Sequence, residues 1–226
     1  MMKRNNFPFS AVLGLNHAKT AILIVLVNPR AGGLLISGPR GIGKSTLMRS
    51  TQELIERPWR DIPVSVTEDR LFGTIDTEKA IYSGQKKLYP GIINEADQGV
   101  LYLDDANLLR EDLLDSILNI AEVGAYQLER DGLSLRCDTS FTIIAAINPE
   151  SGMLSGACLD QFGLFVNVDN IHDENTRVEI LKRTISFEKD CASFCNLWKL
   201  ENEKIKKAIH SAMSLLPKVV VSSGMK

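Results

Sequence analysis

The chain has 226 residues, of which 44% are apolar and 24% are charged, ordinary values for a globular protein with a proper core. Its net charge of −2 gives no general attraction for nucleic acid, so nucleic-acid binding is not expected. The longest apolar stretch, residues 21–27, is far shorter than the roughly 20 residues of a membrane span. The composition therefore predicts one α/β domain with an appendage and no membrane span.

The first residues, MMKRNNFPFSAVLGL, resemble a secretion signal only faintly. Asn16, His17 and Lys19 interrupt the apolar part, and no clear small-residue cleavage site follows, so secretion is not expected. The four cysteines show no paired CxxC spacing, which argues against a zinc site and a disulfide framework. We expect them to be buried free thiols.

Apolar runs alternate with helical segments along the chain, which predicts a mostly parallel five-stranded sheet between helices. Continuous apolar runs are what a parallel strand buried on both faces requires. A helix is expected over residues 44–56, and a mainly helical region from Asp173 onward. The five expected strands are residues 33–37, 63–67, 100–103, 141–147 and 165–168.

Two segments interrupt this alternation. Residues 69–97 contain a short helix candidate, residues 76–83, and an expected turn at Tyr89-Pro90-Gly91. Residues 126–136 read YQLERDGLSLR, in which alternating residues flank an Asp-Gly pair. Asp-Gly between such runs is a strong β-hairpin signal.

A glycine-rich loop follows the first expected strand and precedes a helix. Residues 38–45 read GPRGIGKS and match the pattern G-x-x-x-x-G-K-[ST] of a P-loop. Such glycines let backbone N–H groups point at phosphate oxygens, and the helix start adds its positive dipole end. This predicts ATP and Mg²⁺ as cofactors, with Lys44 on the β and γ phosphates and the Ser45 hydroxyl on the metal. The expected nucleotide-binding residues are Gly38, Pro39, Arg40, Gly41, Ile42, Gly43, Lys44, Ser45 and Thr46.

Two later strands end in polar side chains. The run VLYLDD ends in Asp104 and Asp105, and a buried strand delivers such acids to its carboxyl end beside the phosphate loop. We expect Asp104 to bind the magnesium ion together with Ser45, and Asp105 to polarise the attacking water. Asn148 ends the fourth strand, where its amide could orient water or contact the γ-phosphate. Taken alone, Asn before Pro simply starts a turn.

The P-loop, the strand with two acids and the strand with Asn, in this order, resemble an AAA+ ATPase. More specific segments resemble the I subunit of magnesium chelatase, the ATPase that powers metal insertion into protoporphyrin. The opening FPFSAVLGLNHAK also resembles that family's start, which lies near the adenine. The other matching segments are TEDRLFGTIDTEKAI, PGIINEADQGVLYLDDANLLREDLLDSIL, LERDGLSLR and NPESGML.

The resemblance covers residues 7–222 and implies an organisation for the whole chain. Residues 7–190 would be the AAA+ nucleotide-binding core, with residues 69–97 as its helix-2 insert and residues 126–136 as its pre-sensor hairpin. Residues 191–226 would be a short helical tail leading towards the family's C-terminal helical domain, which this sequence does not reach. The implied partners are the other subunits of an AAA+ ring and a chelatase subunit with an integrin-type domain.

Three departures from the family bear on hydrolysis. The family usually has Glu where Asp105 stands. Asp is one methylene shorter, so its carboxylate would lie further from the attacking water, and a misplacement of about 1 Å can cost on the order of a hundredfold in rate. Its LRPQLLDRFG reads LSGACLDQFG here, so Ser155 and Gln161 replace two arginines. The second is the usual position of the arginine finger, which is worth roughly 10³ to 10⁵ in turnover. We therefore expect intact nucleotide binding and slow hydrolysis.

Two main functions remain open from the sequence. One is the ATPase subunit of a magnesium chelatase-like machine, which couples ATP to metal insertion or to remodelling of a partner. The other is a regulatory or assembly subunit in which ATP is a structural ligand. A third, a chelatase-like protein that acts on DNA, shares the same core but is disfavoured by the acidic balance. A cytoplasmic location is expected, because an ATP-dependent protein belongs where ATP is.

Overall fold

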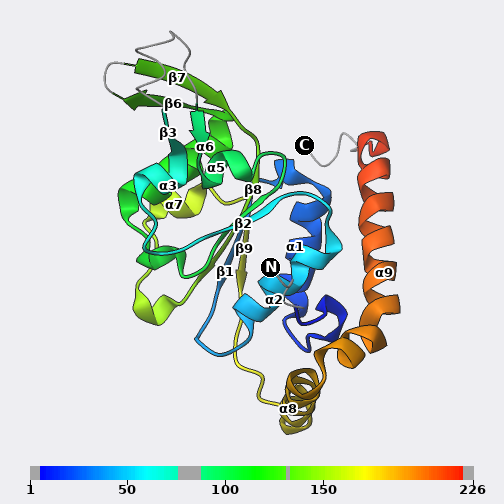
Figure 1. The fold of residues 1–226 in the computed structure, drawn as a ribbon. Helices are drawn as coiled ribbons and strands as arrows, with labels where there is room; N and C mark the ends of the chain where they lie inside the picture. Colours follow the sequence, from blue (N-terminus) through cyan, green and yellow to red (C-terminus); the bar gives the residue numbers. More distant parts are fainter. Residues whose placement is uncertain (1–5, 76–87, 131–132, 221–226) are drawn as a thin grey trace. The chain divides into compact units, whose positions relative to one another are not determined.

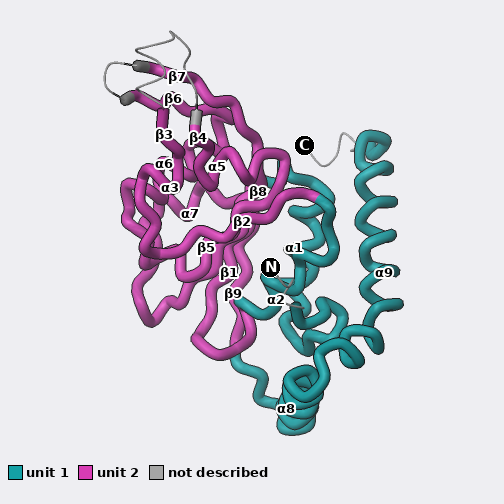
Figure 2. The backbone as a smooth tube through the Cα atoms, viewed as in Figure 1, with its two compact units in different colours: residues 1–31, 45–56, 170–226 teal, residues 32–44, 57–169 magenta. Residues whose placement is uncertain are grey.

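The computed structural model describes residues 6–75, 88–130 and 133–220 (Figure 1). The helix expected over residues 76–83 and the Asp-Gly turn at 131–132 lie outside the described residues. The chain divides into two compact units (Figure 2): unit 1 comprises residues 1–31, 45–56 and 170–226, and unit 2 comprises residues 32–44 and 57–169. The boundary expected at residue 190 stays a prediction.

Unit 2 is built on a five-stranded sheet in the order β2-β5-β8-β1-β9, in which all pairings are parallel. This confirms the predicted α/β fold with its parallel five-stranded sheet. Parallel neighbours need crossover connections, and helices supply several of them in Figure 1. The strands are β1 (Leu34–Ser37), β2 (Trp59–Ile62), β5 (Val100–Leu103), β8 (Thr142–Ile147) and β9 (Leu164–Asn167).

The core of unit 2 lies between one face of this sheet and four helices. Leu35, Leu101 and Ile143 point to this face and pack with apolar side chains of the helices. The alternate residues Ile36 and Ile144 are also buried, which explains why these strands read as continuous apolar runs. Each such side chain contributes roughly 1.5–3 kcal/mol on burial. The four helices are α3 (Glu68–Phe72), α5 (Ile92–Glu95), α6 (Glu111–Val123) and α7 (Gly156–Asp160).

The second strand was predicted at the wrong place. Residues 63–67 form a turn, in which the Val66 N–H donates to the Pro63 carbonyl over 3.0 Å, and the strand is β2, just before them. Pro63 has no N–H for a ladder hydrogen bond. β2 lies at the edge of the sheet and exposes Arg60 and Asp61, so it carries no apolar run. Apolar content alone therefore misses this strand.

The helix expected over residues 44–56 is shorter than predicted. α2 (Lys44–Thr51) ends five residues earlier than expected, and a 3₁₀ turn follows it. The hydroxyls of Ser50 and Thr51 both donate to the Leu47 carbonyl, over 2.6 and 2.9 Å. Such side-chain bonds compete with the helical ladder near its end.

Two small antiparallel sheets complete unit 2. β6 (Ala125–Arg130) pairs with β7 (Leu133–Asp138), which confirms the predicted hairpin. β3 (Gly73–Ile75) pairs with β4 (Leu88–Pro90), and this pair was not predicted. The expected turn at Tyr89-Pro90-Gly91 is wrong for its first two residues, which belong to β4. A proline is tolerated there because β4 is an edge strand and Pro90 is its last residue.

Unit 1 is helical, as expected for the region after Asp173. Asp173 and Asp190 cap α8 and α9 by accepting from the N–H groups of Thr176 and Ser193, over 2.7 and 3.0 Å. An aromatic cluster, in which Phe187 and Phe194 rings lie 5.8 Å apart, joins these two helices. The helices of unit 1 are α1 (Asn16–Val27), α2, α8 (Glu174–Lys189) and α9 (Cys191–Leu215).

Short 3₁₀ segments occur in both units, at Phe9–Ala11, Pro29–Ala31, Gln52–Leu54, Ala106–Leu108, Pro149–Ser151 and Leu216–Lys218. Cys137 and Cys158 are buried free thiols as expected, whereas Cys191 and Cys195 are only half-buried because they lie on α9 near its start. Among the described residues, every helix is too short or too polar to cross a membrane.

Candidate nucleotide-binding site

The predicted site residues of unit 2 follow three adjacent parallel strands. In the sheet, Leu103 of β5 is paired with Ala145 of β8, and Ile147 of β8 with Ser37 of β1. The carboxyl ends of these strands therefore meet at one edge, where open α/β sheets place their ligands. The P-loop follows β1, the two acids follow β5, and Asn148 follows β8.

Two positions of the P-loop require glycine for different physical reasons. Gly41 has φ +81°, in the left-handed region, and a Cβ atom on it would meet no other atom within 4 Å. Gly38 has the opposite constraint, since a Cβ atom there would lie 2.5 Å from the Val168 carbonyl oxygen. One glycine thus turns the loop beside open space, and the other lets the loop lie against the end of β9.

Lys44 is the buried cation of the loop, with 8% of its surface exposed. Its Nζ donates to the carbonyls of Gly38 and Pro39 over 2.5 and 2.8 Å, so the side chain lies along the loop that precedes it. Burial lowers the pKa of Lys44, while Asp105 and Asp104 act in the opposite direction. Both carboxylates therefore act electrostatically on the ammonium group.

The turn after β5 has an unusual backbone. Asp105 has φ +50° and ψ +50°, a left-handed conformation that Asp adopts more readily than most residues. Its carbonyl accepts from the Leu108 N–H over 2.8 Å and starts the short 3₁₀ segment. The chain thus turns directly after the two acids, which leaves both at the carboxyl end of β5.

Asn148 is buried, with 2% of its surface exposed, and its amide is engaged on both sides. Oδ1 accepts from the Glu150 N–H and Nδ2 donates to the Ser151 hydroxyl, each over 3.2 Å. Arg40 of the P-loop also donates to that hydroxyl, over 3.4 Å. Asn148 therefore does start a turn, and this turn is linked to the P-loop. Its action on water or phosphate stays a prediction.

Asn107 belongs to this site but was not predicted. Its Nδ2 donates to the carbonyls of Asn148 and Gly152 over 3.1 and 2.9 Å, which ties the turn after β5 to the turn after β8. Its Oδ1 is buried, with no hydrogen-bond partner among the described residues. Asn107 lies in a segment that resembles the family, but by itself a polar residue shortly after a strand is common in turns and indicated no role.

Comparisons with known proteins agree with this geometry. Residues 33–161 match the AAA domain of the dynein-related subfamily. The magnesium-chelatase 38 kDa subunit of Rhodobacter capsulatus is 35% identical, over 94% of this chain and 70% of its own length. The magnesium-chelatase subunit ChlI homolog of Methanocaldococcus jannaschii is 32% identical, over 100% of this chain and 72% of its own. This chain belongs to the magnesium-chelatase I-subunit family of AAA+ proteins.

A solved structure supports the same assignment. It is described as a model of the complex between subunits BchI and BchD of magnesium chelatase, based on a cryo-EM reconstruction. The similar chain has 35% sequence identity and a TM-score of 0.69, covering 95% of this chain and 77% of its own. The fold of the family member thus extends over nearly all of this sequence.

The residues present fit a magnesium nucleotide better than a metal ion alone. Among the described residues, no group of three or more His, Cys, Asp or Glu side chains could hold a metal. Magnesium in nucleotide sites commonly has only one or two protein ligands, because phosphate oxygens and water supply the rest. Ser45 is half-buried and Thr46 exposed in the first turn of α2. Their contacts, and the metal contact of Asp104, stay predictions.

Ser155 and Gln161, the two positions at which the family resemblance implies arginine, lie at either end of α7. Ser155 is exposed and caps the helix by accepting from the Cys158 N–H over 3.3 Å. Gln161 is exposed directly after the helix. Neither side chain carries a charge.

Proposed function

We propose that this chain binds ATP with Mg²⁺ at its P-loop and serves as the ATP-binding AAA+ subunit of a magnesium chelatase-like machine. The observation that carries the proposal is the buried Lys44, held along a glycine loop, together with the acids Asp104 and Asp105 after the neighbouring strand, whose charges act against the lowering of its pKa by burial. A buried cation beside a loop with open space at Gly41 suits a triphosphate. The names of the relatives support the choice of machine.

Each site residue has a role in this proposal. The loop N–H groups and the start of α2 bind phosphate oxygens, and Lys44 contacts the β and γ phosphates. Ser45 and Asp104 hold the metal, which when bound neutralises charge on the phosphates. Asp105 polarises the attacking water and Asn148 orients it.

Partners follow from the same comparison. A family member occurs in a structure with BchD. We infer that this chain joins an AAA+ ring and contacts a chelatase subunit with an integrin-type domain. ATP binding and weak hydrolysis would then be coupled to metal insertion or to remodelling of that partner.

One observation favours a second function. The neutral Ser155 and Gln161 at α7 supply no positive charge to a neighbour's phosphate, and Asp105 has a shorter reach than Glu. A regulatory or assembly subunit that binds ATP with little turnover is compatible with both features. Measuring ATP turnover separates this function from the first one.

Calorimetry with Mg-ATP tests the binding claim. Lys44→Ala should weaken affinity about ten- to a hundredfold, because charge-assisted hydrogen bonds are worth roughly 1.5–3 kcal/mol. Lys182→Ala is the matched control, since it removes an exposed lysine from α8 and should leave affinity unchanged. Equal affinities of wild type and Lys44→Ala would contradict the P-loop assignment.

A further inference from the structure

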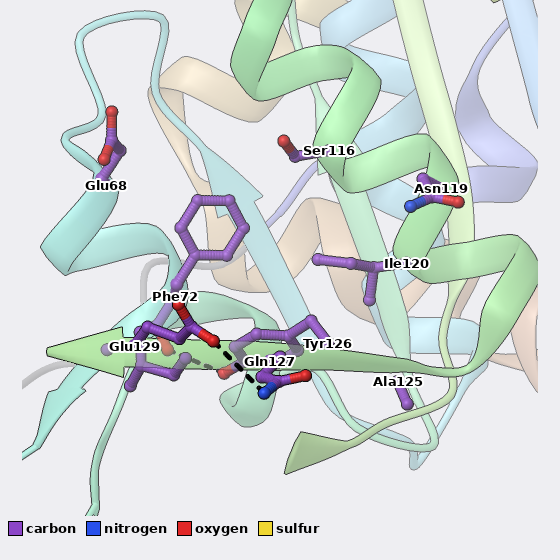
Figure 3. A pocket seen from close by; sticks show the side chains of 11 residues that line it. Glu68, Phe72, Ser116, Asn119, Ile120, Ala125, Tyr126, Gln127 and Glu129 are labelled. Carbon is purple, nitrogen blue, oxygen red and sulfur yellow. Dashed lines mark hydrogen bonds between the residues drawn. The ribbon is translucent and has the colours of Figure 1, made fainter. Parts of the chain in front are cut away.

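Unit 2 contains a pocket of about 680 Å³ between α3, the middle of α6, and β6 (Figure 3). None of the predicted nucleotide-binding or catalytic residues lines it. The pocket is open to solvent, and its lining includes residues of β6 and the first residue of β3, which belong to the two small antiparallel sheets. It is therefore a concave surface separate from the predicted nucleotide-binding residues.

Two aromatic rings form part of its wall. Phe72 and Tyr126 have ring centroids 5.8 Å apart and planes inclined at 49°. The Tyr126 hydroxyl lies 2.7 Å from both the Phe72 carbonyl and the Asn94 Oδ1, which ties β6 to α3 and α5. Donation from the hydroxyl to these oxygens holds the Tyr126 ring in place before a ligand binds, so the side chain loses little conformational entropy on binding.

The polar side chains of the pocket are acidic or neutral. Its described lining includes Glu68 and Glu129 and contains no Lys, Arg or His. In the view of Figure 3, Phe72 is drawn between these two carboxylates. Among the described residues, Glu129 accepts from the neutral Gln127 amide over 3.3 Å, and no described basic side chain forms an ion pair with it. Such a surface repels phosphates and attracts cations.

Glu68 shares its basic neighbour with another carboxylate. Arg110, outside the pocket, lies 3.3 Å from Glu68 but also contacts Asp112. One cation is thus shared by two carboxylates, and all three side chains are largely exposed. Exposed ion pairs of this kind are weak and exchange partners readily. A ligand cation can therefore compete for Glu68.

We propose that this pocket binds an arginine side chain presented by a partner protein. A planar guanidinium group can stack on Phe72 or Tyr126 and bond a carboxylate with two parallel N–H groups, which an ammonium group cannot do. The volume exceeds one side chain, so residues flanking the arginine also fit. This binding needs none of the residues assigned to ATP.

Titration of the ¹⁵N-labelled chain with a short peptide, acetyl-Gly-Arg-Gly-amide, tests the proposal by NMR. We expect shifts confined to the amides around the pocket and a dissociation constant on the order of 1 mM, as one stacked and paired cation provides. The same peptide with neutral citrulline in place of arginine should bind at least about tenfold more weakly, since it keeps the shape and loses the charge.

Variants locate the binding. Glu68→Gln with Glu129→Gln should weaken the arginine peptide about tenfold, because both carboxylates become neutral. Glu122→Gln is the matched control, an exposed carboxylate of α6 outside the pocket, and should change nothing. Calorimetry with Mg-ATP should give wild-type affinity for the double variant, which separates this proposal from the nucleotide claim.

Three results would overturn the proposal: equal binding of the citrulline peptide, tighter binding of the matching lysine peptide, or wild-type affinity in the double variant. Phe72→Leu gives a second test of the aromatic wall. It should weaken the arginine peptide about threefold or more, with the unfolding midpoint recorded to show that the fold persists.

Discussion

At the scale of single residues, the site depends on side chains whose partners lie far along the chain. Lys44 bonds to carbonyls within its own loop, and this local geometry belongs to the P-loop motif. Asn107, by contrast, reaches two carbonyls more than forty residues away. It therefore holds Asn148 in place, although the sequence indicated no role of its own for it in the site.

Variants of Asn107 measure how much its two hydrogen bonds contribute to stability. Asn107→Ala removes two hydrogen bonds and should lower the free energy of unfolding by about 1–2 kcal/mol, the loss being reduced because the buried, unpaired Oδ1 also disappears. Asn107→Asp should destabilise more, since a carboxylate cannot donate to the two carbonyls and repels them. Urea denaturation measures both, and Asn175→Ala, an exposed amide of α8, is the control. An Asp variant as stable as wild type would contradict this role.

At the scale of elements, capping and burial decide where structure begins and ends. α8 and α9 begin at aspartates that accept helix N–H groups. Hydrogen bonds to the charged carboxylate hold the pKa values of Asp173 and Asp190 below their ordinary value, and the Thr176 and Ser193 side chains contribute most. Ionised aspartate is therefore the form that stabilises the helix starts.

These caps predict how stability depends on pH. Because the folded pKa values lie below the ordinary value of 3.8, the contribution is fully present above that value and is lost as pH falls through the folded pKa. Asp173→Asn with Asp190→Asn should keep the caps, since Asn caps as well as Asp, but reduce the fall in thermal midpoint between pH 7 and pH 3. Asp169→Asn, an exposed aspartate that caps no helix, should show the wild-type fall.

At the scale of the whole molecule, assembly should control turnover. Ser155 and Gln161, where the family resemblance implies arginine, are exposed, neutral side chains at the ends of α7. If neighbouring subunits complete each other's sites, an isolated chain should bind ATP and hydrolyse it slowly. A phosphate-release assay of the lone protein in which several ATP molecules are turned over each second would contradict this expectation.

Restoring the charge tests the same idea. Gln161→Arg, alone or with Asp105→Glu, should raise turnover at least about tenfold, as part of the large effect of an arginine finger, and the gain should grow with protein concentration. Gln161→Leu, which changes the same position without adding charge, should not raise it. Turnover and light scattering across a dilution series measure both. A gain in turnover that does not change with protein concentration would show that the arginine does not act on a neighbouring subunit.

The sequence by itself determined the features whose causes are local. The P-loop, the strands buried on both faces, the β6–β7 hairpin and the helical region after Asp173 follow from glycine spacing, continuous apolar runs and turn residues. Family resemblance added the AAA+ assignment, which the comparisons confirm.

Only the tertiary structure decided the features that depend on distant partners. β2 is a strand because β5 pairs with it at the edge of the sheet, and an edge strand needs no apolar run. The hydrogen bonds of Asn107 and the pocket beside Tyr126 form because segments far apart in the sequence meet in unit 2. Periodicity and turn chemistry report on a residue's near neighbours in the chain, whereas these contacts arise only when crossover connections bring separate strands and helices together.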